Sequence, residues 1–175
     1  MHLETTVIPN AVNLGFFEKH QVIHRSKLHK HNDKKSGKVT LVFLGRLVER
    51  KGCRQFLKAV TKLYFDHNIK NIEVVIGGSG PQSEMLKKYV VQNKLTPVVR
   101  FLGQLSEAEK SALLSSADIV VLPSLAGESF GIVLLEAMAV GTPVVAGNNS
   151  GYSSVMTGKG RLSLVNPLST TDFTQ

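Results

Sequence analysis

Short apolar runs rich in β-branched residues recur along the chain at regular intervals. Each is four to six residues long and is bounded by glycine, proline or polar residues, which is typical of buried strands. The pattern predicts strands over residues 39–44, 72–76, 98–102, 118–122 and 143–146, and a weaker one over 162–165.

Helical spacing fills the gaps between these runs. The apolar positions Phe56, Leu57, Val60, Leu63 and Tyr64 lie on one face of a helix. A second helix would bury Met85, Leu86, Tyr89 and Val90, a third opens with the capping box Ser106-Glu-Ala-Glu109 and contains Leu113 and Leu114, and a fourth covers 130–140.

This alternation of strands and helices predicts an α/β fold. Near-continuous apolar strands suit an open, mostly parallel, Rossmann-like sheet that is covered by helices on both faces. In such sheets ligands bind beyond the carboxyl ends of the strands. Residues that directly follow strands are therefore the first candidates for chemistry.

Composition narrows the class of protein. The 175 residues are 42% hydrophobic and 19% charged, which suits one globular domain. A single cysteine, Cys53, excludes an intrachain disulfide, and no apolar run approaches the about 20 residues that span a bilayer. The start has no secretory pattern, so we expect a cytoplasmic protein.

The positive charge is concentrated at the start of the chain. Formal net charge is +8, and residues 1–38 hold seven Lys/Arg against three acids. We interpret residues 24–35 as a solvated loop. Phosphate binding or peripheral membrane contact through 19–38 is an alternative, and a metal site from His24, His29 and His31 is a weaker one. No aromatic residues interrupt the basic run, so no nucleic-acid partner is expected.

Two cations follow the first predicted strand. Arg46 comes directly after Gly45, and Lys51 precedes the next helix. Beside a helix N-terminus the pair would form a diphosphate clamp, whereas the alternative is two solubilising surface charges. The turn Gly77-Gly-Ser-Gly80 after the second strand permits close backbone approach to a ligand, but a tight turn needs glycine anyway.

The sharpest feature follows the fourth strand. Glu128 precedes a helix and Glu136 lies eight positions later, about 80° past two full turns, so both can face one cleft. Free backbone N–H groups at Phe130, Gly131 and Ile132 could bind an anion. The alternative is that neither has a functional role: Glu128 would be an ordinary acid at a helix N-terminus, and Glu136 a half-exposed residue on a helix face.

Together these segments resemble the family 4 (group 1) retaining glycosyltransferases. The carrying motifs are Gly45-Arg46 with Lys51-Gly52, the 77–80 turn, Arg100-Phe-Leu-Gly103, and two glutamates with seven residues between them and Phe-Gly shortly after the first. The likeness spans residues 6–168, and phosphatidylinositol mannosyltransferase-like members are the most similar. It implies one half of a GT-B fold, the carboxyl-terminal half that binds the nucleotide-sugar donor.

The resemblance also implies roles for individual residues. Glu128 would contact the transferred sugar, and Glu136 would bind the ribose. The donor diphosphate would be bound by Arg46, Lys51, Gly78 and Gly80. The transferred sugar and the phosphate would contact the backbone of Phe130, Gly131, Ile132 and Val133. The nucleobase would be bordered by Arg100, Phe101 and Leu102. The donor would be UDP- or GDP-linked, with no cofactor and no metal.

The chain departs from the family in several places. Ser154 stands where members carry a glutamate, and residues 14–37 are unusually long and basic. We expect residues 1–37 to be an interdomain linker and basic loop, 38–168 the donor-binding domain and 169–175 a truncated tail. No acceptor-binding half precedes residue 38, so the chain is expected to be a fragment that is inactive alone. A non-catalytic nucleotide- or partner-binding module is the alternative.

Overall fold

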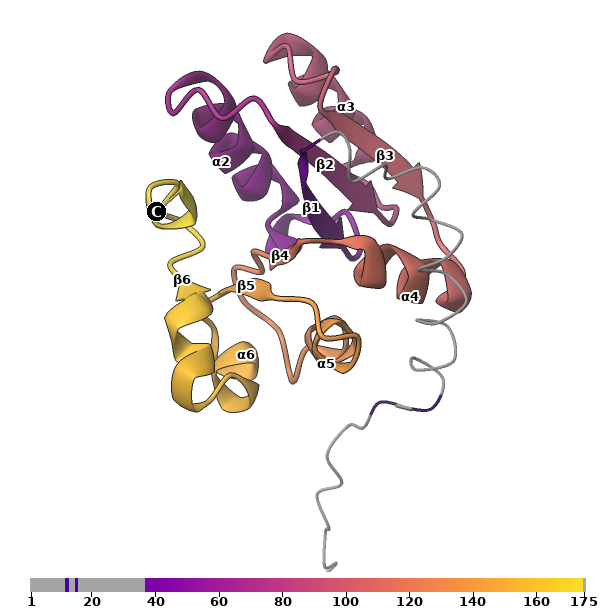
Figure 1. The fold of residues 1–175 in the computed structure, drawn as a ribbon, viewed down its shortest axis with the longest axis vertical. Helices are drawn as coiled ribbons and strands as arrows, with labels where there is room; N and C mark the ends of the chain where they lie inside the picture. Colours follow the sequence, from indigo (N-terminus) through magenta and orange to yellow (C-terminus); the bar gives the residue numbers. More distant parts are fainter. Residues whose placement is uncertain (1–11, 13–14, 16–36, 175) are drawn as a thin grey trace, which may run out of the picture.

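A computed structural model describes residues 12, 15 and 37–174, and within them six strands form one parallel sheet (Figure 1). The strand order is β3-β2-β1-β4-β5-β6, and every pair is parallel. The strands are β1 (Val39–Leu44), β2 (Ile72–Gly77), β3 (Val99–Gly103), β4 (Ile119–Leu122), β5 (Val144–Gly147) and β6 (Leu164–Val165). All six predicted strands are confirmed, with ends shifted by at most two residues.

Helices cover both faces of this sheet, as the apolar strands predict. The α-helices are α2 (Cys53–Phe65), α3 (Ser83–Gln92), α4 (Glu107–Ser116), α5 (Ile132–Ala139) and α6 (Ser150–Val155). Short 3-10 turns are η2 (Glu49–Lys51), η3 (Gly158–Ser163) and η4 (Asp172–Thr174). Within the described part, no helix is long and apolar enough to cross a bilayer.

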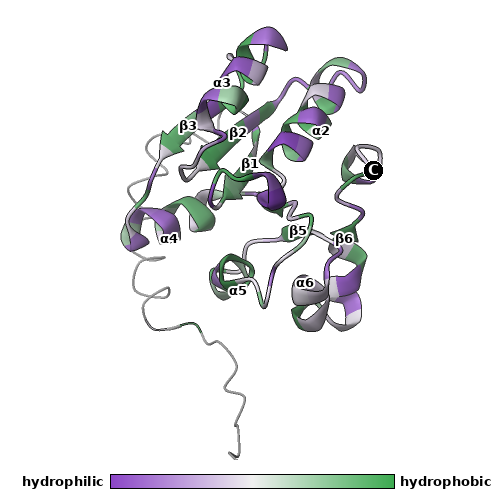
Figure 2. Cartoon of the chain, turned by 180° about the vertical axis from the view of Figure 1, so that it is seen from behind, coloured by the Kyte–Doolittle hydropathy of each residue, from purple (hydrophilic) through white to green (hydrophobic). Residues whose placement is uncertain are grey.

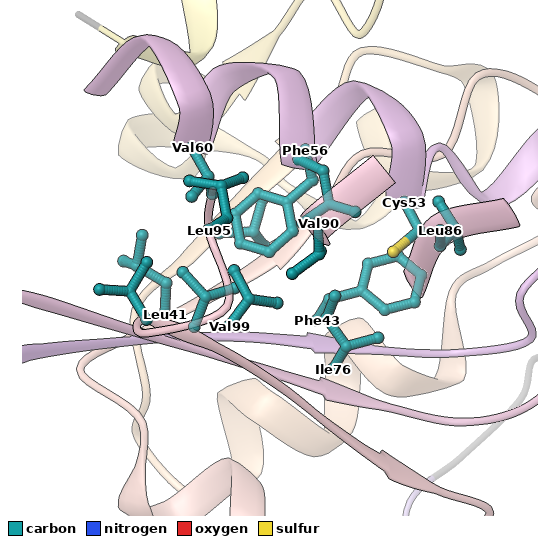
Figure 3. Packing of buried hydrophobic residues seen from close by; sticks show 14 of the residues in the cluster. Leu41, Phe43, Cys53, Phe56, Val60, Ile76, Leu86, Val90, Leu95 and Val99 are labelled. Carbon is teal, nitrogen blue, oxygen red and sulfur yellow. The ribbon is translucent and has the colours of Figure 1, made fainter. Parts of the chain in front are cut away.

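Alternate residues of each strand feed two separate cores. Leu41 and Phe43 of β1 pack with α2 and α3, and Figure 3 shows Phe56 and Val60 of α2 above them. Val42 and Leu44 point to the other face, where they pack with α4, α5 and α6. In Figure 2 the amphipathic helices α2 and α3 alternate between green and purple along their length. The confirmed fold class is therefore α/β and Rossmann-like.

One local prediction was wrong, and one helix was missed. Met85 was expected on the buried face of α3, but its side chain is exposed, and Leu86 and Val90 fill that face. Met85 lies about 100° around the helix from Leu86, outside the stripe that faces the core. The helix α6 was not predicted, since its sequence, SGYSSV, is polar and has no apolar periodicity.

The strand order fixes where a ligand can bind. The order reverses between β1 and β4, which lie side by side at the centre of the sheet. Loops that leave the carboxyl ends of these two strands run in opposite directions and leave a crevice between them. The loop after β1 carries Arg46 and Lys51, and the loop after β4 carries Glu128.

Candidate functional site

A pocket of about 320 Å³ opens at this switch point. The apolar part of its lining includes Phe43, Leu44 and Leu122 from the ends of β1 and β4. The rest of the lining consists of the cations Arg50 and Lys51, Ser124, residues 127–133 and Tyr152. The structure thus brings together Lys51, Glu128 and the segment Phe130–Val133, which the sequence placed in one site.

Glu128 is the centre of the charged network in this pocket. Its side chain is only 8% exposed and forms an ion pair with Lys51 through Oε1. Arg50 adds a second cation, with Nη1 3.6 Å from the same oxygen. Arg50 Nη1 also donates to the carbonyl of Gly127 at 3.0 Å, which ties the two loops together. Two cations thus offset the cost of burying this carboxylate.

Two hydroxyls extend the hydrogen-bond network of Glu128. Ser124 is buried and its Oγ donates to Glu128 Oε1 at 2.9 Å. The hydroxyl of Tyr152, which is also buried, lies 3.1 Å from Ser124 Oγ. Burial raises the pKa of Tyr152 to about 12, an effect that its hydrogen bond with Ser124 opposes and the charge of Glu128 reinforces. The phenol is therefore neutral at physiological pH.

The N-terminus of α5 also lines the pocket. Gly131 is its N-cap and adopts a left-handed conformation, with φ of 80°. A Cβ at this position would lie 2.4 Å from the Tyr152 ring, so glycine is required both for the conformation and for the contact. The first N–H groups of a helix have no intrahelical acceptor, so those of Ile132 and Val133 can bind an anion.

Glu136 is buried but lies outside the lining of this pocket. Desolvation by burial raises its pKa; the charge of Lys110 opposes this shift and that of Glu107 adds to it. Its Oε2 has no hydrogen-bond partner among the described residues. A buried carboxylate oxygen of this kind requires a donor, which a bound ligand can supply.

Arg46 and the glycine turn lie outside the lining as well. The Arg46 side chain is exposed at the carboxyl end of β1. Gly78 and Gly80 serve the packing of two loops, because a Cβ would lie 1.9 Å from the Gly45 carbonyl oxygen and 2.5 Å from that of Leu47. Leu47 N also donates to Ser79 O at 2.9 Å. Their roles toward a diphosphate stay predictions.

The predicted nucleobase border lies on the outer strand β3. Arg100 is held by an ion pair with Glu73 of β2, with Nε 2.8 Å from Oε1. Leu102 is 38% exposed and Phe101 is half-buried. None of these three residues lines the pocket, so their contact with a base also stays a prediction.

Comparison with known proteins identifies the family. Residues 24–173 match the family described as "Glycosyl transferases group 1". The chain belongs to the group 1 glycosyltransferases. The phosphatidyl-myo-inositol mannosyltransferase of Mycolicibacterium smegmatis is 42% identical over 118 residues, which is 67% of this chain and 29% of that protein. The enzyme of the same name from Mycobacterium tuberculosis is 35% identical over 150 residues, 85% of this chain and 36% of that protein.

Solved structures of glycosyltransferases share the fold of this group 1 chain. Anabaena HepE, in complex with UDP and glucose, superposes with a TM-score of 0.79 at 21% identity, over 97% of this chain and 45% of that chain. The C-terminal domain of the Francisella tularensis group 1 protein LpcC gives 0.68 at 24% identity, over 78% and 71%. The chain spans about a third of the length of the mannosyltransferases it matches.

Three residues of the site in this group 1 chain were missed by sequence reasoning. Ser124 follows Pro123 at the end of β4, so its position at a strand end could have identified it. Arg50 precedes Lys51 and could have been identified as a second cation. Tyr152 had no such signal, because it lies in the unpredicted helix α6 and reaches the pocket only through tertiary packing.

The remaining predictions concern metal and membrane. Within the described residues no cluster of three His, Cys, Asp or Glu side chains could hold a metal ion. His24, His29 and His31 lie outside these residues, as does nearly all of the basic stretch 19–38. The alternative roles of that stretch therefore stay predictions.

Proposed function

We propose that this chain is the donor-binding domain of a two-domain, family 4 retaining glycosyltransferase that transfers a hexosyl group from a UDP- or GDP-linked sugar. The observation that carries the proposal is the convergence of Lys51, Glu128 and the N-terminus of α5 on one pocket at the switch point. A cation with free amides suits a diphosphate, and a carboxylate suits sugar hydroxyls. A nucleotide sugar joins these two chemistries in one molecule.

The diphosphate would lie between Lys51 and the first turn of α5. Lys51 reaches the pocket from η2, and Ile132 and Val133, at the positive end of the helix dipole of α5, line the same pocket. Arg46 would close over the phosphates from the exposed loop. These groups would stabilise the leaving diphosphate as the C1–O bond breaks, without a metal ion.

The sugar and the ribose would each contact one glutamate. Glu128 would accept hydrogen bonds from sugar hydroxyls and so orient the ring; it is not assigned as a nucleophile. Glu136 would bind ribose hydroxyls, and its unpartnered buried Oε2 supports this role. The backbone of residues 100–102 would border the base.

The relatives support this donor class. Two of them are named phosphatidyl-myo-inositol mannosyltransferases, and the HepE structures contain UDP, UDP with glucose, or UDP-glucose. For this chain the acceptor site would come from an amino-terminal domain, and closure of the two domains would assemble the complete cleft. The isolated chain is therefore expected to bind donor without efficient transfer.

Calorimetric titration of the chain with UDP, GDP and ADP tests the proposal. We expect UDP or GDP to bind, and Lys51→Met to weaken that nucleotide by about 10-fold or more, the size of a charge-assisted hydrogen bond. Lys58→Met is the matched control, since Lys58 is exposed on α2. If none of the three nucleotides binds, or if Lys51→Met and Lys58→Met weaken binding equally, the proposed donor site is refuted.

A further inference from the structure

Three side chains that line the pocket form a hydrogen-bonded row. Tyr152 from α6, Ser124 from the end of β4 and Glu128 from the following loop are joined by contacts of 3.1 and 2.9 Å. Tyr152 and Ser124 are 2% and 1% exposed. Buried polar groups of this kind stabilise a defined geometry only when each of them is satisfied.

The direction of both hydrogen bonds follows from the number of available protons. An ionised carboxylate only accepts, so Ser124 must donate its single hydroxyl proton to Glu128 Oε1. Ser124 then has no proton left for Tyr152, and Tyr152 must be the donor in the other contact. The row therefore runs from the Tyr152 hydroxyl through Ser124 to Glu128, in which each bond polarises the next.

All polar contacts of the Glu128 carboxylate within the described residues converge on one oxygen. Oε1 meets Lys51, Arg50 and Ser124, whereas Oε2 has no protein partner there. Lys51 and Arg50 both have long, flexible side chains. Ser124, by contrast, has a short side chain, is 1% exposed and lies two residues beyond the end of β4, so its bond fixes the rotation of the carboxylate group.

The helix α6 holds Tyr152 in place for this bond. Asn149 caps the helix by accepting from Tyr152 N at 3.1 Å, and its Nδ2 donates to Ser124 O at 3.1 Å. The Tyr152 ring packs against Gly131, and the chain at Gly151 lies against the backbone of Glu128. Residues 149–152 thus position both Tyr152 and Ser124.

We propose that Ser124 and Tyr152 are positioning residues that fix Glu128 Oε1 and so present Oε2 to the sugar of the donor. This rests on the proposed function, in which Glu128 contacts that sugar. A misrotated carboxylate would still leave the diphosphate contacts of Lys51 and α5 intact. The row should therefore control the sugar-dependent part of donor affinity and leave nucleotide affinity unchanged.

The binding test compares a nucleoside diphosphate with its sugar conjugate, using UDP with UDP-glucose and GDP with GDP-mannose. For each pair, calorimetry gives the ratio of the affinity for the nucleotide sugar to the affinity for the nucleotide alone. We expect Ser124→Ala, which loses a charge-assisted bond, to lower this ratio about 10-fold, and Tyr152→Phe, which loses a neutral bond, to lower it about 3-fold. The affinity for UDP or GDP alone should stay within about twofold of wild type. Ser154→Ala is the matched control, because this exposed hydroxyl donates within its own helix, to Gly151 O.

An unchanged ratio in Tyr152→Phe and Ser124→Ala would overturn the proposal. So would an equal loss of affinity for both members of a pair, because that would indicate general distortion of the pocket. Tyr152→Phe retains the ring that packs on Gly131, so it remains informative even where Ser124→Ala fails to fold.

A second measurement needs no ligand and separates this proposal from the proposed function. Urea midpoints are compared for Tyr152→Phe, Glu128→Ala and the double variant, in the wild-type and the Ser124→Ala background. Tyr152 and Glu128 share no direct hydrogen bond, so any coupling between them passes through Ser124. We therefore expect the midpoint shifts of Tyr152→Phe and Glu128→Ala to be non-additive in the wild-type background and additive in the Ser124→Ala background. Additive shifts in both backgrounds would overturn the row. If no nucleotide binds wild type, the proposed function fails, and this cycle alone decides whether the row exists.

Discussion

Lys51 and Glu128 form an ion pair although 77 residues separate them in the sequence. One comes from the loop after β1 and the other from the loop after β4, so the pair closes the switch point of the sheet. Both side chains are mostly buried, at 18% and 8% exposure. A donor diphosphate that binds Lys51 must therefore compete with the carboxylate of Glu128.

This competition predicts opposite effects for the two partners. Glu128→Gln removes both the competing charge and its repulsion of phosphate, so we expect UDP or GDP, which carry no hexose, to bind about threefold more tightly. Lys51→Met should weaken the same nucleotide. Calorimetry measures both, and weaker nucleotide binding by Glu128→Gln would contradict the competition.

Arg46 and Arg50 should differ in what their loss affects. Arg50 bonds to Gly127 and pairs with Glu128, so Arg50→Ala should lower the free energy of unfolding by about 1 kcal/mol and also weaken nucleotide binding. Arg46 is exposed, so Arg46→Ala should weaken binding alone. Urea denaturation and calorimetry on both variants test this, and a loss of stability in Arg46→Ala would argue against it.

Gly131 should be far less replaceable than Gly141. Both have positive φ, 80° and 73°, so alanine at either site costs about 1–2 kcal/mol of conformational strain. A Cβ at Gly131 would also lie 2.4 Å from the Tyr152 ring, whereas a Cβ at Gly141 would have no described atom within 4 Å beyond its chain neighbours. We expect Gly131→Ala to lower the free energy of unfolding by about 1–3 kcal/mol more than Gly141→Ala. Equal losses in urea denaturation would contradict the contact.

The buried Glu136 predicts a pH dependence of stability. Burial raises its pKa, so it holds its proton in the folded state at pH values where the unfolded chain, with a glutamate pKa of about 4.3, has lost it. The folded protein then binds more protons across this window, and stability falls as pH rises through it. Glu136→Gln removes this loss and should stabilise the protein at pH 7, with an advantage that shrinks toward pH 4.

Glu84 serves as the control for this experiment. Its pKa is lowered by the hydrogen bond and the charge of Lys87, so its contribution is lost as pH falls and has the opposite sign. Glu84→Gln should therefore bring no gain at pH 7. Urea denaturation between pH 4 and pH 8 measures both variants, and a Glu136→Gln variant without a gain at pH 7 would refute the burial cost.

The sequence predicted the sheet well because each strand is a local signal. Runs such as Val39–Leu44 are apolar, β-branched and closed by glycine, so their ends were found within two residues. The capping box at Ser106 and Glu109 is equally local and was confirmed. Met85 failed because apolar character alone does not say on which side of a narrow stripe a residue lies.

The site was predicted only in part, because its geometry depends on packing between distant loops. Lys51, Glu128 and the start of α5 lie in the segments that connect strands to the following helices, where the topology brings them together. Tyr152 reaches the same pocket from α6, a polar segment without periodicity, and no local pattern marks it. The glycines at 78 and 80 were read as ligand contacts, yet they also allow two backbones to touch.

The most direct test of the central claim is to locate a bound nucleotide on the 175-residue chain. Amide chemical-shift mapping in an ¹⁵N-labelled sample, titrated with UDP or GDP, reports each backbone N–H separately. We predict the largest shifts at Ile132 and Val133, with Lys51 and Gly131 beside them, and their loss in Lys51→Met. Shifts that leave the start of α5 unchanged and gather elsewhere, such as at Lys159 and Arg161 of η3, would contradict a donor site between β1 and β4.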